Sequence, residues 1–184
     1  MIGHFIYFRG AEEFLFTLGA PIGAMVSGLL YRGKWKIVLV YYLALLGAYF
    51  ATPIVWQLGD LAILGMWDVF LALGLLFAVV AIIGKWKNLW NTKSSACLFY
   101  ILALCTFIGL EADVLFRIFV FVPCQTYRVL GGGYDLDALR AIWVLGAVET
   151  STKAALSTVV GVTAGLPITK VVRKMGLALT EESS

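Results

Sequence analysis

Five charged residues lie inside two long apolar stretches in the second half of the chain. Glu111, Asp113 and Arg117 belong to one stretch, and Glu149 and Lys153 belong to the other. A charge at the centre of a membrane span costs about 2.5–3.5 kcal/mol on insertion scales, so such residues face the inside of a helix bundle and have partners. We therefore treat these five residues as candidates for a binding site.

Their spacing permits two patterns of pairing. Asp113 and Arg117 are four residues apart, as are Glu149 and Lys153, so each pair can neutralise itself along its own helix. All five residues lie roughly 9–18 Å below the outer ends of their stretches, so Arg117 can instead reach Glu149, and Lys153 can reach Asp113. Glu111 lies about 160° around the helix from Asp113 and has no partner nearby in the sequence.

The charges therefore support two interpretations. Three acids against two bases leave one acid in excess, which requires a proton or a cation. In the first interpretation the charges line an outward-facing cavity for a small polar solute, which the excess acid predicts to be cationic. Glu111 or Glu149 is then the unpaired acceptor. In the second, the charges are ion pairs that fix how two helices dock. We favour the cavity, because ionisable residues inside a membrane are functional by default and these converge at one depth.

The composition indicates that lipid surrounds most of the chain. Hydrophobic residues make up 61% of the 184 residues and charged residues only 14%, more apolar surface than a soluble domain of this size buries. We predict an all-α, polytopic membrane helix bundle that forms a single domain over residues 1–184. Its five predicted spans are about Phe14–Tyr31, Ile37–Gln57, Leu61–Gly84, Ala96–Val122 and Ala141–Ile168.

The charges between the spans predict their orientation. Basic clusters follow alternate spans and belong on the cytoplasmic side, which places the N-terminus outside and the C-terminus in the cytoplasm of a multi-pass cell-membrane protein. The basic residues sit in short clusters between apolar runs, a pattern that argues against nucleic-acid binding. The clusters are Arg32, Lys34 and Lys36; Lys85, Lys87 and Lys93; and Lys170, Arg173 and Lys174. The opposite ends carry Glu12, Glu13, Asp60, Asp68, Asp135 and Asp137.

Small residues at four-residue spacing form a smooth face on the first and the last span. Such faces let two helices approach closely in lipid, where van der Waals contact holds them together. These faces either pack the two helices within the chain or dock another membrane subunit, and the sequence leaves both open. The candidate docking residues are Gly19, Gly23 and Ser27 in the first span and Ser157, Gly161 and Gly165 in the last.

The sequence offers little for enzymatic or metal chemistry. The three cysteines Cys97, Cys105 and Cys124 have no zinc-binding spacing, and His4 is the only histidine. The chain contains neither a Gly-x-Ser-x-Gly nor a His-Glu-x-x-His motif. We therefore predict a protein that is not an enzyme, with no metal and no cofactor.

Two segments resemble a transporter family. Leu18–Leu30 looks like the start of the second helix in the substrate-binding S components of energy-coupling factor (ECF) transporters, and Glu149–Lys174 is similar to their last helix. The resemblance implies a vitamin or micronutrient uptake subunit that holds its solute in an outer-half cavity. It also implies a partner, a transmembrane coupling subunit powered by separate ATPases. The family's first helix, which carries its coupling motif, has no counterpart before Phe14.

The resemblance also implies positions for the solute contacts. Glu149, Lys153 and Trp143 on the last helix, and Glu111 and Asp113 on the preceding one, match where the family's solute contacts lie. The alternative function is a structural or assembly subunit of a larger membrane complex, which would use the small-residue faces as its contacts.

Overall fold

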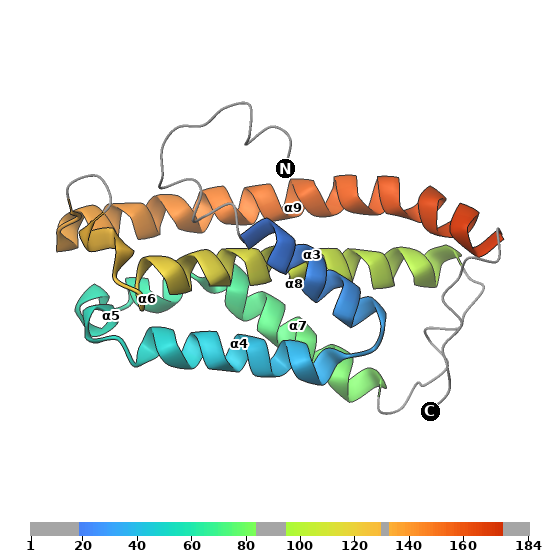
Figure 1. Ribbon diagram of the computed structural model, residues 1–184. Helices are drawn as coiled ribbons and strands as arrows, with labels where there is room; N and C mark the ends of the chain where they lie inside the picture. The colour runs from blue at the N-terminus through green and yellow to red at the C-terminus, as the bar shows by residue number, and fades with distance from the viewer. Residues whose placement is uncertain (1–18, 84–94, 130–132, 175–184) are drawn as a thin grey trace.

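The computed structural model describes residues 19–83, 95–129 and 133–174 (Figure 1). Every regular element in these ranges is a helix, so the predicted all-α class is confirmed for the described residues. The predictions that fall outside them are residues 14–18 of the first span, Gly84 at the end of the third span, the basic cluster at Lys85–Lys93, and the acidic pair Glu12 and Glu13.

One helix, α8 (Ser95–Phe121), runs through the middle of the bundle and makes its main contacts with four other α-helices. The long helix α9 (Leu136–Lys174) lies along one side of it, and α4 (Trp35–Phe50) and α7 (Trp67–Ile83) lie on the other side (Figure 1). α3 (Gly19–Tyr31) crosses α8 at an angle. α8 thereby lies between α9 and α4, whereas α7 contacts both α8 and α9.

The prediction for α8 is confirmed to within one residue at each end, whereas α9 is longer than predicted at both ends. Its N-terminus moves back from residue 141 because Asp135 caps it: the Asp135 carboxylate accepts from the backbone N–H of Ala138 at 2.8 Å. An acidic cap of this kind satisfies an N–H group that would otherwise lack a partner in the first turn. The C-terminus extends to Lys174, past Pro167 inside the helix.

The second predicted span is wrong as one continuous helix. α4 ends at Phe50, and the short helix α5 (Pro53–Leu58) begins at a proline. Thr52 has an extended backbone, with φ −83° and ψ 122°, which is the conformation that a following proline favours. Proline also lacks the N–H that would continue the helix, so Pro53 starts a new one.

The third predicted span is also interrupted. A one-turn helix, α6 (Leu61–Leu64), is followed by Gly65 and Met66 before α7 begins at Trp67. The break places Asp68, which we predicted at an outer connection, in the first turn of α7, where only 1% of it is exposed. That prediction for Asp68 is wrong, and the residue belongs to the interior.

Hydrogen bonds from tyrosine and serine side chains fasten α4 and α3 to the backbone of α8. The hydroxyls of Tyr42 and Tyr41 donate to the carbonyls of Ile108 at 2.6 Å and Ala112 at 2.8 Å. The Ser27 hydroxyl lies 2.9 Å from the carbonyl of Cys105. Such bonds supply part of the association energy between helices that lie in lipid.

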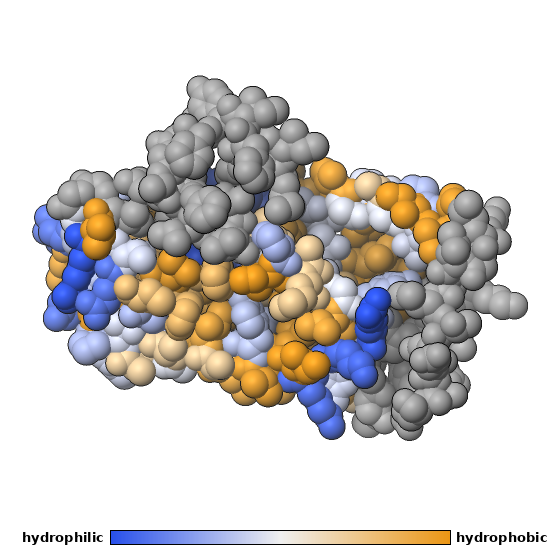
Figure 2. All heavy atoms as spheres, in the orientation of Figure 1, coloured by the Kyte–Doolittle hydropathy of each residue, from blue (hydrophilic) through white to orange (hydrophobic). Residues whose placement is uncertain are grey.

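Two described helices, α8 and α9, are long and apolar enough to cross a membrane, while α3, α4 and α7 are apolar but shorter. Only 6% of the most apolar window of α9 is buried, whereas the core helix of a soluble protein is mostly buried. Figure 2 shows hydrophobic side chains over the middle of the visible face and along its upper right, with hydrophilic ones gathered at the left end and at the lower right. Exposed apolar residues of α9 include Leu145, Val148, Leu156, Val159, Val160 and Ile168. This distribution is typical of a protein that lies in a membrane.

Candidate functional site

A cavity of about 610 Å³ lies between α8 and α9, beside the break that precedes α7. Ligand pockets are commonly roughly 300–1,000 Å³, so a small organic molecule fits. Five of the six predicted binding residues line this cavity, and Glu111 does not. The predicted residues in its wall are Asp113, Arg117, Trp143, Glu149 and Lys153; the others include Gly65, Val114, Phe121, Tyr134, Gly146, Thr150, Ala154 and Ser157.

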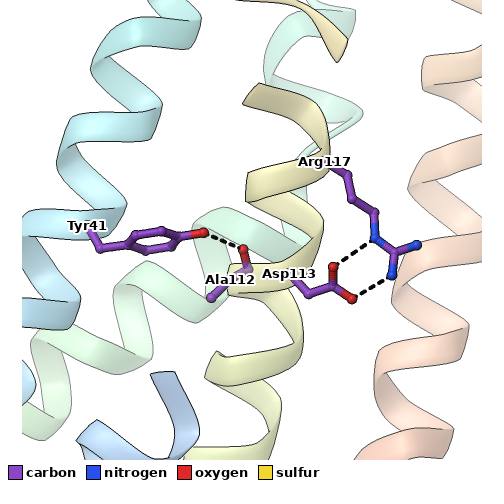
Figure 3. A network of polar contacts seen from close by, with 4 residues as sticks. All are labelled: Tyr41, Ala112, Asp113 and Arg117. Atoms are coloured by element: carbon purple, nitrogen blue, oxygen red, sulfur yellow. Dashed lines mark hydrogen bonds and ion pairs between the residues drawn. The ribbon is translucent and has the colours of Figure 1, made fainter. Parts of the chain in front are cut away.

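On the α8 side, Asp113 and Arg117 form a bidentate ion pair. Nε of Arg117 donates to Oδ1 of Asp113 at 2.8 Å, and Nη2 donates to Oδ2 at 2.6 Å. Figure 3 shows the guanidinium on the side of α8 that faces α9. The side chain of Asp113 is 13% exposed and that of Arg117 is 41% exposed, so the acid is held in the wall while the base reaches into the cavity.

On the α9 side, Lys153 donates to the carboxylate of Glu149 one helical turn earlier. Both side chains are largely exposed, at 71% for Lys153 and 62% for Glu149. Each ion pair therefore closes along its own helix, which is the first of the two patterns that the spacing allowed. The described residues show no ion pair between the two helices.

The aromatic residues of the cavity gather toward the C-terminal end of α8 and the start of α9. Trp143 is 5% exposed, and its ring lies nearly parallel to the ring of Tyr49 at 6.3 Å, with an interplanar angle of 7°. Its Nε1 donates to the Tyr49 hydroxyl at 3.1 Å. Phe121 stacks on Trp143 at 6.3 Å and contacts Tyr134 at 5.9 Å. The cavity thus has an aromatic end and a charged middle.

The lack of a side chain at Gly65 leaves room for the indole ring of Trp143. A Cβ atom at Gly65 would lie 2.4 Å from Cδ1 of the indole, closer than real atoms approach. The break between α6 and α7 therefore lets the tryptophan pack against the backbone. The sequence alone pointed to Trp143 only through the family resemblance, and it gave no sign that Gly65 makes room for it.

The small-residue face of α3 packs against α8. A Cβ at Gly23 would lie 2.7 Å from the carbonyl oxygen of Gly109, and one at Gly109 would lie 1.9 Å from Oγ of Ser27. A Cβ at Gly19 would lie 1.7 Å from Oδ1 of Asp113. The prediction that these residues form a docking face for another subunit is wrong, because α8 already covers them.

The small-residue face of α9 is also turned toward α8. A Cβ at Gly161 would lie 2.9 Å from Cγ2 of Thr106, and one at Gly165 would lie 3.8 Å from Cδ1 of Leu102. Ser157, the third residue of this face, lines the cavity. Packing within the chain, one of the two alternatives, therefore describes these residues, although the partner is α8 and not the first span.

Glu111 lies elsewhere, in the core. None of its surface is exposed, and neither carboxylate oxygen has a hydrogen-bond partner among the described residues. Its predicted place in the cavity is wrong, because the 160° that separates it from Asp113 turns it away from the wall. Without Glu111 the cavity lining holds two acids, Asp113 and Glu149, and two bases, Arg117 and Lys153. The excess acid that predicted a cationic solute is therefore outside the cavity.

Asp68 is a polar residue of the interior that we did not assign to the site. Its Oδ1 accepts from the backbone N–H of Val69 at 2.9 Å. Its Oδ2 lies 2.7 Å from Oγ1 of Thr150 and 3.1 Å from Oγ of Ser151. Since Thr150 lines the cavity, Asp68 stands directly behind the wall. The sequence signal that could have identified Asp68 as an interior residue was its position, seven residues inside an apolar stretch.

No family model, curated protein or solved structure matches the chain. The case for its function therefore rests on the cavity itself. Two neutralised ion pairs, hydroxyl groups and an aromatic end can bind a small molecule through hydrogen bonds and ring contacts. Among the described residues no cluster of three or more His, Cys, Asp or Glu side chains could hold a metal ion.

Proposed function

We propose that this chain is a multi-pass membrane protein that binds a small polar solute in the cavity between α8 and α9, as the substrate-binding subunit of an importer. The observation that carries the proposal is the cavity of about 610 Å³ whose wall brings together Asp113, Arg117, Glu149 and Lys153. Charged residues at mid-depth in a membrane protein are expensive, and they are usually retained where they contact a solute or an ion.

The balance of charge favours a solute that is dipolar or zwitterionic over one with a strong net charge. Each acid in the wall already has a base one helical turn away. A solute with both a donor and an acceptor group can bond to both members of a pair without leaving a buried charge unpaired. The aromatic end around Trp143 suits an apolar or ring-bearing part of the same molecule.

The proposed orientation has the N-terminus outside and the C-terminus in the cytoplasm, with the aromatic end of the cavity facing out. It is supported by the distribution of exposed charges: the connection of α3 to α4 carries basic residues and no acidic one, whereas the opposite end carries acidic residues together with Arg128 and Arg140. Arg32, Lys34 and Lys36 lie at the connection of α3 to α4, and Asp60 and Asp135 lie at the opposite end. Positive charges favour the cytoplasmic side.

Uptake against a gradient would require an energy source. The resemblance of Leu18–Leu30 and Glu149–Lys174 to S components of ECF transporters favours a transmembrane coupling subunit with separate ATPases as the partner, and a vitamin or other micronutrient as the solute. The assembly-subunit alternative has less support, because its two small-residue faces are turned toward α8.

A thermal-shift screen tests the proposal. The purified protein is heated with water-soluble vitamins, amino acids and amines, each at high concentration. We expect one class of solute to raise the unfolding temperature, by about 5 °C at a hundredfold excess over its Kd. Glu149→Gln should reduce this shift. The matched control Asp137→Asn, an acid in an exposed pair with Arg140 outside the cavity, should retain it.

The proposal is wrong if no solute shifts the unfolding temperature and Glu149→Gln leaves the growth of cells that depend on the chain unchanged. A solute that stabilises both variants equally would bind somewhere other than the cavity.

A further inference from the structure

The guanidinium of Arg117 uses only one of its two hydrogen-bonding edges. Nε and Nη2 bond side by side to the two carboxylate oxygens of Asp113, at 2.8 and 2.6 Å. A guanidinium has five N–H groups, so both hydrogens of Nη1 and one of Nη2 remain. None of these remaining N–H groups bonds to a residue that the structure describes. The second edge, formed by Nη1 and Nη2, is again a planar pair of donors and can receive a second carboxylate.

This second edge faces the cavity and is held in position. Arg117 lines the cavity, and Figure 3 shows its remaining nitrogen, Nη1, on the far side of the guanidinium from Asp113. Asp113 is mostly buried and rests against the backbone of Gly19, so the acid that fixes the guanidinium has little room to move. A pair of donors that is fixed before a ligand arrives loses less conformational entropy on binding. Arg117 therefore offers a preorganised site for a carboxylate.

The opposite helix supplies a place for a positive group. Lys153 donates to Oε1 of Glu149, and the other carboxylate oxygen, Oε2, has no donor among the described residues. Both residues line the same cavity as Arg117. The two acids and two bases of the wall sum to zero charge, so a bound carboxylate alone would leave one negative charge in excess. A positive group on the same solute, bound at Oε2 of Glu149, restores the balance.

The aromatic end of the cavity lies next to this edge of Arg117. Phe121 follows Arg117 by four residues on α8, which is about one helical turn, and both line the cavity. Phe121 stacks on Trp143 and contacts Tyr134. The flat faces of such residues suit a ring, because aromatic pairs gain energy beyond the area they bury. A solute held at Arg117 by its carboxylate can therefore place a ring among these side chains.

We propose that the second edge of Arg117 binds the carboxylate of the solute, and that the solute is a ring-bearing amino acid whose ammonium group binds Glu149. The inference rests on the proposed function, since it names the class of solute that the cavity takes. It also assigns separate tasks to the two bonds of the arginine: Asp113 orients the guanidinium, and the outer edge selects the solute. Lysine cannot do both, because a compact ammonium has no second planar edge once it is paired with an acid.

Comparison of acids with their amides tests the assignment in the wild-type protein. L-Tryptophan and L-phenylalanine are titrated into the full chain, purified in detergent, beside L-tryptophanamide and L-phenylalaninamide. The amides keep the ring and the ammonium group but lack the carboxylate. We expect at least one of the two amino acids to bind, and to bind at least about tenfold more tightly than its amide. An amide that binds as tightly as its acid would overturn the proposal, whatever the variants do.

The variant Arg117→Lys tests which residue reads the carboxylate. It keeps the positive charge and should lose most of the preference for the acid over the amide, a ratio that a general loss of stability does not change. The matched control Arg140→Lys, in the exposed pair with Asp137 outside the cavity, should keep the full preference. A preference that persists unchanged in Arg117→Lys would show that another group binds the carboxylate.

The same titrations separate this inference from the proposed function. If neither amino acid binds while a solute without a carboxylate raises the unfolding temperature in the thermal-shift screen, the class of solute is wrong and the proposed function stands. If no solute of any class binds, both are wrong.

Discussion

The carboxylate of Asp113 lies directly against the backbone of Gly19, so that a Cβ atom at Gly19 would come within 1.7 Å of Oδ1. The close crossing of α3 over α8 and the ion pair of the cavity wall are therefore one arrangement. The absence of a side chain at Gly19 lets Asp113 rest against α3, and Asp113 in turn holds Arg117 toward α9 (Figure 3). Substitutions on the face of α3 that contacts α8 should consequently alter the position of Asp113 and Arg117 in the cavity wall.

Gly23→Ala should destabilise the protein. Its Cβ would lie 2.7 Å from the carbonyl oxygen of Gly109, and a backbone atom in a packed helix cannot move aside cheaply. We expect a loss of about 1–3 kcal/mol in the free energy of unfolding, measured by thermal or denaturant unfolding in detergent. Gly28→Ala is the matched control, because a Cβ there meets nothing within 4 Å. It should leave the stability equal or slightly higher, and equal losses in both variants would contradict the close crossing.

Arg117→Gln should cost more than the double variant Asp113→Asn with Arg117→Gln. Removing the guanidinium leaves the mostly buried carboxylate without its two donors, whereas the double change removes both charges. We expect the single variant to lose about 1–2 kcal/mol and the double variant to recover part of it, measured as free energies of unfolding. Arg140→Gln breaks an exposed pair and should change little. Additive losses in the double variant would show that the two side chains are not coupled.

Tyr49→Phe should also lower the stability. The hydroxyl of Tyr49 accepts from the indole N–H of Trp143 at 3.1 Å and donates to the carbonyl of Ala62 at 3.2 Å. Its removal leaves a buried indole N–H without a partner, at a cost of about 1–3 kcal/mol. Tyr100→Phe changes a tyrosine that is 67% exposed and should have a negligible effect. The fluorescence of Trp143 should shift only in the first variant.

The sequence predicted which residues share one face of a helix better than it predicted what each face contacts. The four-residue spacing identified Gly19, Gly23 and Ser27 as a smooth face, but spacing carries no information on which surface covers it, and α8 does so. It also put Glu111 and Asp113 on different faces of one helix, yet equal depth led us to group them in one site. The depth of a residue along a helix does not determine the direction in which its side chain points. The structure gives both, and it shows that Glu111 and Asp113 point to different regions.

Helix ends were predictable where hydropathy changes sharply and unpredictable where an apolar run continues through a break. The limits of α8 agree with the prediction to one residue. The breaks at Pro53 and Gly65 lie within apolar runs, so a hydropathy profile does not reveal them. The break at Gly65 mattered most, because it brings Asp68 into the interior and makes room for Trp143.

The native cysteines test the orientation in the membrane. Cys124 is exposed in the turn that follows α8, and Cys97 lies in the first turn at the other end of that helix. In intact cells a membrane-impermeant maleimide should label Cys124, and Cys124→Ser should lose this labelling. Cys97 should stay unlabelled until the cells are opened. Labelling of Cys124 only after permeabilisation would reverse the proposed orientation.

The cavity can be filled without disturbing its surroundings, which gives the most direct test of solute binding. Gly146 lies in the cavity wall, and a Cβ there meets nothing within 4 Å. Gly47 is equally unobstructed but lies on α4, outside the cavity wall. In a binding measurement with the solute that stabilises the wild-type protein, Gly146→Leu should weaken binding at least about tenfold, since a bulky group occupies the solute's place. Gly47→Leu should bind like the wild type. Unchanged affinity in Gly146→Leu, in a protein as stable as the Gly47→Leu control, would contradict the cavity between α8 and α9 as the binding site.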